Sequence, residues 1–162
     1  MEISVRDVLA KPEWVYKLSA FLHDAVALEA FSYDEASSTF SLPLYRISYE
    51  YRRHKRLLWL INSWVMPKVP CVLSIRPVRI AKAPFADEKS RLNDQLLGFG
   101  VSGDGSIDLM FRYSSIVLKC VDTASMLLSD TGEPTWNMRT TDFGRLLLSE
   151  DLIGEVLGTS ET

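Results

Sequence analysis

The sequence lacks any apolar run approaching the ~20 residues that a membrane-spanning helix needs, so no membrane span is expected. Its first residues, MEISVRDVLAKPEW, carry acids and no continuous apolar region, which is not the pattern of a secretory signal. Two cysteines, Cys71 and Cys120, are too few for a disulfide framework. Together these absences predict a protein of the reducing cytoplasm.

Histidine is equally scarce. His23 and His54 are the only two, and neither has a second imidazole or a cysteine at metal-ligand spacing. We therefore expect neither a metal site nor a cofactor. Acidic residues are plentiful, but most fall at turns or strand ends, where acids are common in any protein. No pair of carboxylates stands out for general acid–base catalysis.

The sequence contains the residue spacing of a dinucleotide-binding motif but not the helix that the motif requires. Gly98, Gly100 and Gly103 have the spacing GxGxxG, but that motif binds pyrophosphate only where the third glycine opens a helix. Here SIDLMFRY follows, with the period of a strand. Residues 102–105 are therefore predicted to form a hairpin turn, in which glycine supplies a positive φ angle.

The composition that remains is typical of one globular domain, with 162 residues, 47% of them hydrophobic and 24% charged. The net charge of −3 argues mildly against a general nucleic-acid binder. The charge is uneven, however: residues 46–91 hold 11 Lys and Arg against 3 Asp and Glu, a net +8, and the rest of the chain carries −11. This asymmetry keeps an anionic ligand or an acidic protein among the expected partners.

The N-terminal third predicts a helix followed by a β-hairpin. Pro12 stands at a first-turn position, and apolar residues follow it at helical spacing, which predicts an amphipathic helix over about 12–26. From Ala27 the period changes to two. The runs 27–34 and 39–51 flank a polar turn and are predicted to pair as a hairpin.

One irregularity lies inside the second of these runs. Phe40, Leu42 and Leu44 share one phase of the strand. The residues that follow, Tyr45, Ile47, Tyr49 and Tyr51, occupy the opposite phase. Because proline cannot donate a ladder hydrogen bond, we predict a β-bulge at Pro43–Tyr45 on an edge strand.

Further strands and one polar loop, 83–94, are predicted downstream. The run RLLWLINSWV is apolar on both faces, which predicts a strand covered on both sides, and Pro77 predicts an edge position or a bulge in the next run. The predicted strands after the hairpin are 56–65, 70–83, 95–101, 106–113 and 115–122.

The expected fold is mainly β, of the α+β class, with about seven antiparallel strands in a bent sheet or partly closed barrel. By analogy, a pleckstrin-homology-like roll with the N-terminal helix packed over it suits these elements. One domain is predicted over 1–141, followed by a tail over 142–162. Ser149 as an N-cap and Gly158 as a stop predict a short helix over about 150–157 in this tail.

A basic run, Arg52, Arg53, Lys55 and Arg56, interrupts the aromatic stretch YRISYEYRRHKRLLWLINSWV. The favoured interpretation is a solvated hairpin turn, in which charge also discourages aggregation at the strand ends. The alternative is a site where guanidinium groups converge on phosphate or carboxylate groups of an anionic ligand or acidic protein.

The segments FLHDAVALEAFSYDEASSTFSLPLYRISYE (21–50) and VDTASMLLSDTGEPTWNMRT (121–140) carry a family resemblance. In their order and spacing, the chain resembles a bacterial family known as domain of unknown function twenty-nine forty-eight, over roughly Asp7 to Thr141. It departs from that family in the tail beyond Thr141 and in its richer tryptophan content at 59–64. The resemblance implies a short cytoplasmic bacterial protein and provides no active-site residues.

Three functions follow as hypotheses. The first is a non-catalytic binding or accessory module that uses a basic face or a sheet edge. Homodimerisation through strand edges or the tail helix is one form of it. The second is a small enzyme with a site assembled from His23, Cys71 and nearby acids. The third is a single-stranded nucleic-acid binder, which requires exposed aromatic rings at Tyr49, Tyr51 or Trp59.

Overall fold

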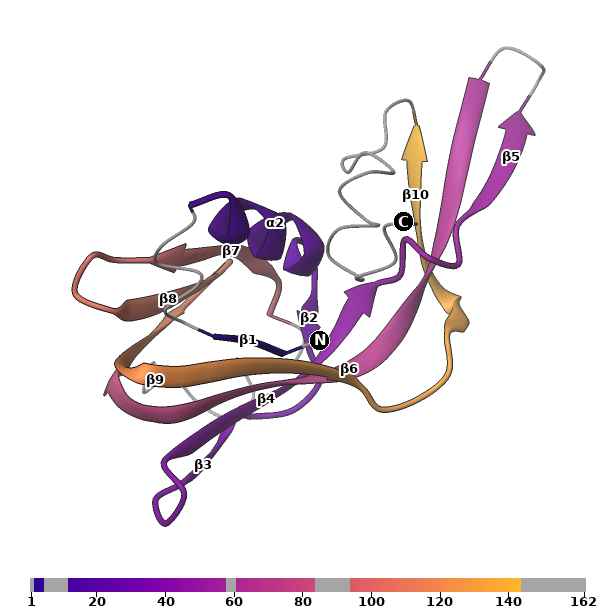
Figure 1. Cartoon of the computed structure of the whole chain (residues 1–162). Coiled ribbons are helices and arrows are strands. Elements are labelled where there is room, and N and C mark those ends of the chain that lie inside the picture. Colours follow the sequence, from indigo (N-terminus) through magenta and orange to yellow (C-terminus); the bar gives the residue numbers. More distant parts are fainter. Residues whose placement is uncertain (1, 5–11, 58–60, 84–93, 144–162) are drawn as a thin grey trace, which may run out of the picture.

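The computed structural model describes residues 2–4, 12–57, 61–83 and 94–143, which form one helix and a ten-stranded sheet (Figure 1). In chain order the elements are β1 (Glu2–Ser4), α2 (Pro12–Leu22), β2 (Val26–Ala27), β3 (Ser32–Asp34), β4 (Thr39–Ile47), β5 (Arg53–Leu57), β6 (Ile61–Lys82), β7 (Leu96–Val101), β8 (Ser106–Phe111), β9 (Ser115–Asp130) and β10 (Thr135–Phe143). The predicted helix 150–157 lies outside the described residues, and so does the predicted loop 83–94 except for its first and last residues.

All strand pairs are antiparallel, which confirms a mainly antiparallel β fold. The main path of the sheet is β2-β4-β6-β9-β8-β7, with β3 beside β4, β1 beside β9, and both β5 and β10 beside β6. The expected number of about seven strands is wrong. β1, β2 and β3 have two or three residues each, which is too short for an alternating pattern to reveal them. The nine-residue β10, Thr135–Phe143, was also not predicted.

The two ends of this path meet at one point. Val26 in β2, at one end of the path, forms a single β-bridge with Gln95, the residue before β7 at the other end. Beside the bridge, the Leu96 N–H donates to the Ala25 carbonyl at 2.7 Å, and the Ala27 N–H donates to the Asp94 carbonyl at 3.0 Å. The sheet is therefore open along most of its edge but bent far enough to enclose a core; we call this bent path the barrel.

The helix α2 covers the core from one side, lying along β7 and close to β4 (Figure 1). Leu18, Phe21 and Leu22 are buried in the same cluster as the inward side chains of the sheet. Burial of side chains of this size contributes roughly 1.5–3 kcal/mol each. The helix ends at Leu22, earlier than the predicted residue 26, because Asp24 has a left-handed φ of 64°.

The predicted β-bulge at Pro43–Tyr45 is wrong. The register of β4 with β6 runs without a shift from Phe40 opposite Ile75 to Ile47 opposite Lys68. On the side of β4 away from β6, Pro43 faces the gap between β2 and β3, where no described strand requires a ladder hydrogen bond from its nitrogen. Its carbonyl accepts the Leu28 N–H there at 3.0 Å.

The predicted strands 56–65 and 70–83 are also wrong in their limits. Residues 53–57 form β5, and a single 22-residue strand, β6, then runs from Ile61 to Lys82. Pro77 lies beyond the β4–β6 register, which ends at Ile75, and the register of β6 with β9 shifts between Arg76 and Val78. The expected irregularity at Pro77 is therefore present.

The first part of β6 extends beyond the barrel. Residues 61–68 of β6 are flanked by β5 on one side and by β10 on the other, and Figure 1 shows these three strands projecting together. We call β5, residues 61–68 of β6, and β10 the arm. Because β6 continues from the arm into the barrel without interruption, one strand carries both parts.

Candidate functional site

The basic run forms a strand on the arm, and the predicted turn over Arg52–Arg56 is wrong. The turn comes earlier: β4 ends at Ile47, and the Arg52 N–H donates to the Tyr49 carbonyl at 3.3 Å. From Arg53 the chain pairs with β6. Among the strands that the structure describes, β5 pairs with β6 alone, so its other side is an edge of the sheet.

One face of the arm gathers side chains around Trp64. His54 lies directly opposite Trp64 in the β5–β6 register, and the centroids of the two rings are 4.9 Å apart. The Arg52 guanidinium carbon lies 5.1 Å from the Trp64 ring centroid. Contacts of this kind are worth about 0.5–1 kcal/mol where solvent reaches them.

The opposite face of the arm carries a second contact. Arg53 is adjacent to His54 in an extended strand, so its side chain projects to the other face. Its guanidinium carbon lies 3.9 Å from the ring centroid of Trp136, which belongs to β10. Because β5 and β10 flank β6, this contact crosses β6, and Val65 beneath it is only 6% exposed.

Lys55 and Arg56 continue the same strand. Their backbones lie opposite Ser63 and Asn62 of β6. The structure therefore places the four predicted basic residues in succession along the chain, Arg52 immediately before β5 and the other three within it.

The aromatic residues named for nucleic-acid stacking separate from one another. Tyr49 is buried at 2% exposure, in the turn that precedes β5, whereas Tyr51 is 55% exposed beside Arg52. Trp59 lies outside the described residues. The continuous tyrosine face expected from the alternation in the sequence therefore does not form.

A buried charge network that the sequence patterns did not predict lies where the arm joins the barrel. The side chain of Arg46 on β4 is 4% exposed and makes a two-pronged contact with Asp130 at the end of β9: Nε to Oδ1 at 3.0 Å, and Nη2 to Oδ2 at 2.8 Å. Glu50 approaches from the other side, with Oε1 2.8 Å from Nη2. Ser48 donates to the same carboxylate at 2.6 Å.

This network is structural in its chemistry. Burial by itself would lower the pKa of Arg46, but its hydrogen bonds to Asp130 and Glu50 outweigh burial and hold that pKa above its usual range. The guanidinium also lies 4.7 Å from the Phe21 ring of α2. Arg46 therefore links β4, β9, the turn before β5, and the helix, and stays charged.

Cys71 and His23, named for a catalytic site, lie in different settings. Cys71 is 1% exposed on the inward face of β6, and burial raises the pKa of its thiol to about 12, so the thiolate is scarce near neutral pH. The side chain of His23 is 45% exposed after α2, with Nδ1 3.2 Å from Oδ1 of Asp24. Cysteine catalysis needs a thiolate and a base in reach, and no contact between the two residues is present.

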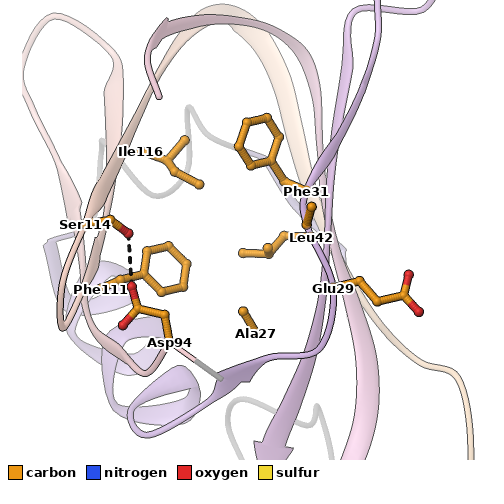
Figure 2. Close-up of a pocket in the computed structure, with 9 residues that line it drawn as sticks. Ala27, Glu29, Phe31, Leu42, Asp94, Phe111, Ser114 and Ile116 are labelled. Carbon is orange, nitrogen blue, oxygen red and sulfur yellow. Dashed lines mark hydrogen bonds between the residues drawn. The ribbon is translucent and has the colours of Figure 1, made fainter. Parts of the chain in front are cut away.

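The barrel encloses an apolar pocket, shown in Figure 2. The side chains of Phe31, Leu42, Phe111 and Ile116 converge on it, and the carboxylate of Asp94 at its side accepts a hydrogen bond from Ser114 at 3.1 Å. A water-sized sphere fits in only about 20 Å³ of the pocket. Sites for small ligands and cofactors usually span about 300–1,000 Å³, so this pocket is a packing gap with room for about one water molecule.

Within residues 2–4, 12–57, 61–83 and 94–143, no group of three or more His, Cys, Asp or Glu side chains is placed to hold a metal ion. In the same part of the chain, no helix has the length and apolar character to cross a membrane.

No protein-family model, curated protein or solved structure matches this chain. The resemblance to domain of unknown function twenty-nine forty-eight therefore stays a prediction.

Proposed function

We propose that this chain is a non-catalytic binding module that takes an anionic partner on β5 of the arm. The observation that carries the proposal is the pair of successive arginines, Arg52 and Arg53, fixed against Trp64 on one face and Trp136 on the other. The planar guanidinium of arginine presents a fork of N–H donors that matches carboxylate or phosphate oxygens. Long-range attraction by the basic segment supports capture of such a partner.

Two further observations support a binding surface over a catalytic site. The pocket in the barrel has room for about one water molecule, and Cys71 is held as a buried thiol. The strong bend of the sheet supports a pleckstrin-homology-like roll as the proposed architecture. In such a roll, the arm would project from the rest of the molecule.

The test is binding of the full chain to an acidic polypeptide, a single-stranded oligonucleotide and anionic vesicles, each at low and moderate salt. The variant Arg52→Glu, Arg53→Glu is expected to lose at least about tenfold in affinity for the ligand that the wild type binds. The matched control is Arg76→Glu, Arg79→Glu, which makes the same charge change at two exposed positions on the barrel part of β6. Circular dichroism checks that each variant folds.

Binding that is salt-sensitive, lost in the arm variant and kept in the control supports the proposal. Equal losses of affinity in both variants would indicate attraction to net charge alone. If the wild type binds none of the three ligands, the proposal is contradicted.

Single-stranded nucleic acid is a second candidate partner because Tyr51 is 55% exposed next to Arg52, and an exposed ring beside a guanidinium can stack a base. Burial of Tyr49 removes the neighbouring ring from such a platform. In the same panel, this candidate predicts that Tyr51→Ala weakens oligonucleotide binding while leaving polypeptide binding unchanged.

A further inference from the structure

We infer that the partner on β5 is an acidic protein segment in extended conformation, which adds to the sheet as a further strand along the outer edge of β5. This inference rests on the proposed function and specifies its geometry. It distinguishes a ligand that pairs its backbone with β5 from one that contacts only the basic side chains.

The backbone of β5 provides the first argument. Its five residues, Arg53–Leu57, are paired with residues 65–61 of β6 without a shift in register, so the strand is regularly paired along that length. In an extended strand, alternate residues direct their N–H and C=O groups to opposite sides. No other described strand pairs with β5, and Figure 1 shows β5 as the outermost strand of the arm. Such an edge is a template for strand addition.

The charge pattern provides the second argument, because it selects the occupant. Arg52 and Arg53 contact rings on opposite faces of the arm, and Lys55 and Arg56 follow them in the same strand. A strand laid beside β5 places its own consecutive side chains on alternate faces as well. Consecutive acidic residues in that strand would therefore meet basic residues on both faces at once.

The same pattern argues against a second copy of this chain at this edge. Pairing two β5 strands would place like charges opposite one another, which is destabilising in a sheet. Basic side chains on an edge strand are a known protection against self-association. Homodimerisation through strand edges, if it occurs, is expected at an edge other than β5.

The experiment uses the full chain and a synthetic peptide of consecutive aspartate and glutamate residues flanked by valines. Two derivatives carry N-methyl groups on alternate peptide nitrogens, one set on the odd positions and one on the even positions. Both keep every acidic side chain. Because successive N–H groups of a strand point in opposite directions, only one set would face β5. We expect that set to weaken binding by at least about tenfold and the other to have little effect, apart from any change in the peptide's own conformation.

The outcomes separate the two proposals. If both methylated sets bind as well as the unmodified peptide, strand addition is wrong and the basic surface alone is responsible. If the peptide fails to bind while an oligonucleotide or anionic vesicles bind in an Arg52- and Arg53-dependent way, the inference falls and the proposed function stands. If none of these ligands binds, both fall.

Discussion

At the residue scale, Arg46 organises the junction between arm and barrel. It occupies the inward phase of β4 that Phe40, Leu42 and Leu44 share, so a charge stands where an apolar residue is the rule. A buried charge is tolerated only with partners, and Asp130 and Glu50 supply them. An arginine in the apolar phase of a strand was the available signal, but its partner Asp130 lies 84 residues away in the sequence.

Replacing Arg46 with leucine is expected to lower the free energy of unfolding by about 2–4 kcal/mol, because the carboxylates lose their partner. The low end is favoured by the 46% exposure of Asp130, which water can solvate. Urea unfolding measures the change. Arg79→Leu, at an exposed position of β6, is the control, and its effect should stay within about 0.5 kcal/mol. Equal effects of the two substitutions would contradict a structural role for the network.

Cys71 predicts a pH dependence of stability. The pKa of its thiol is raised from an ordinary value of 9.0 to about 12 by burial. The unfolded chain therefore releases this proton first as the pH rises, so the free energy of unfolding falls between these two values. Urea unfolding of the wild type and of Cys71→Ala at several pH values measures the difference, and the variant should show a shallower fall. Parallel curves for the two proteins would contradict the prediction.

At the element scale, local signals were enough for several turns and strands, but not for the arm. The polar turn between β3 and β4 and the glycine turn between β7 and β8 lie where residue chemistry predicts them, with Gly105 at a φ of 79°. The boundary between β5 and β6 has no such signal, because the run Leu57–Ile61 is apolar and contains neither glycine nor proline. The sequence interpretation therefore placed a turn over most of β5 and one strand, 56–65, across the boundary.

The connection from β9 to β10 depends on a close backbone approach. The Thr131 N–H donates to the Pro70 carbonyl at 2.8 Å, and a Cβ atom added to Gly132 would lie 2.9 Å from Cγ of Pro70. We expect Gly132→Ala to cost about 1 kcal/mol in the free energy of unfolding. Gly103→Ala is the matched control, since a Cβ there would meet nothing within 4 Å. Thermal unfolding of both variants tests this, and a larger loss for Gly103→Ala would be evidence against the close approach.

At the scale of the whole molecule, the protein is one open, bent sheet, in which the part named the barrel supports the arm. The core of the barrel is closed, with a gap of about 20 Å³, whereas the arm carries the basic strand outward. The uneven charge of the sequence was visible before the structure, but its arrangement on one edge strand was not, because it depends on where β5 pairs. The packed core of the barrel and the basic strand on the arm are the basis for a binding function located on the arm.

The most direct measurement is amide hydrogen exchange, residue by residue, with and without the acidic peptide. If β5 is the binding edge, exchange should slow at alternate amides within Arg53–Leu57, while the amides that already pair with β6 and those of β8 in the barrel change little. Unchanged exchange in β5 with a saturating amount of bound peptide, or slowing confined to the barrel, would contradict the account.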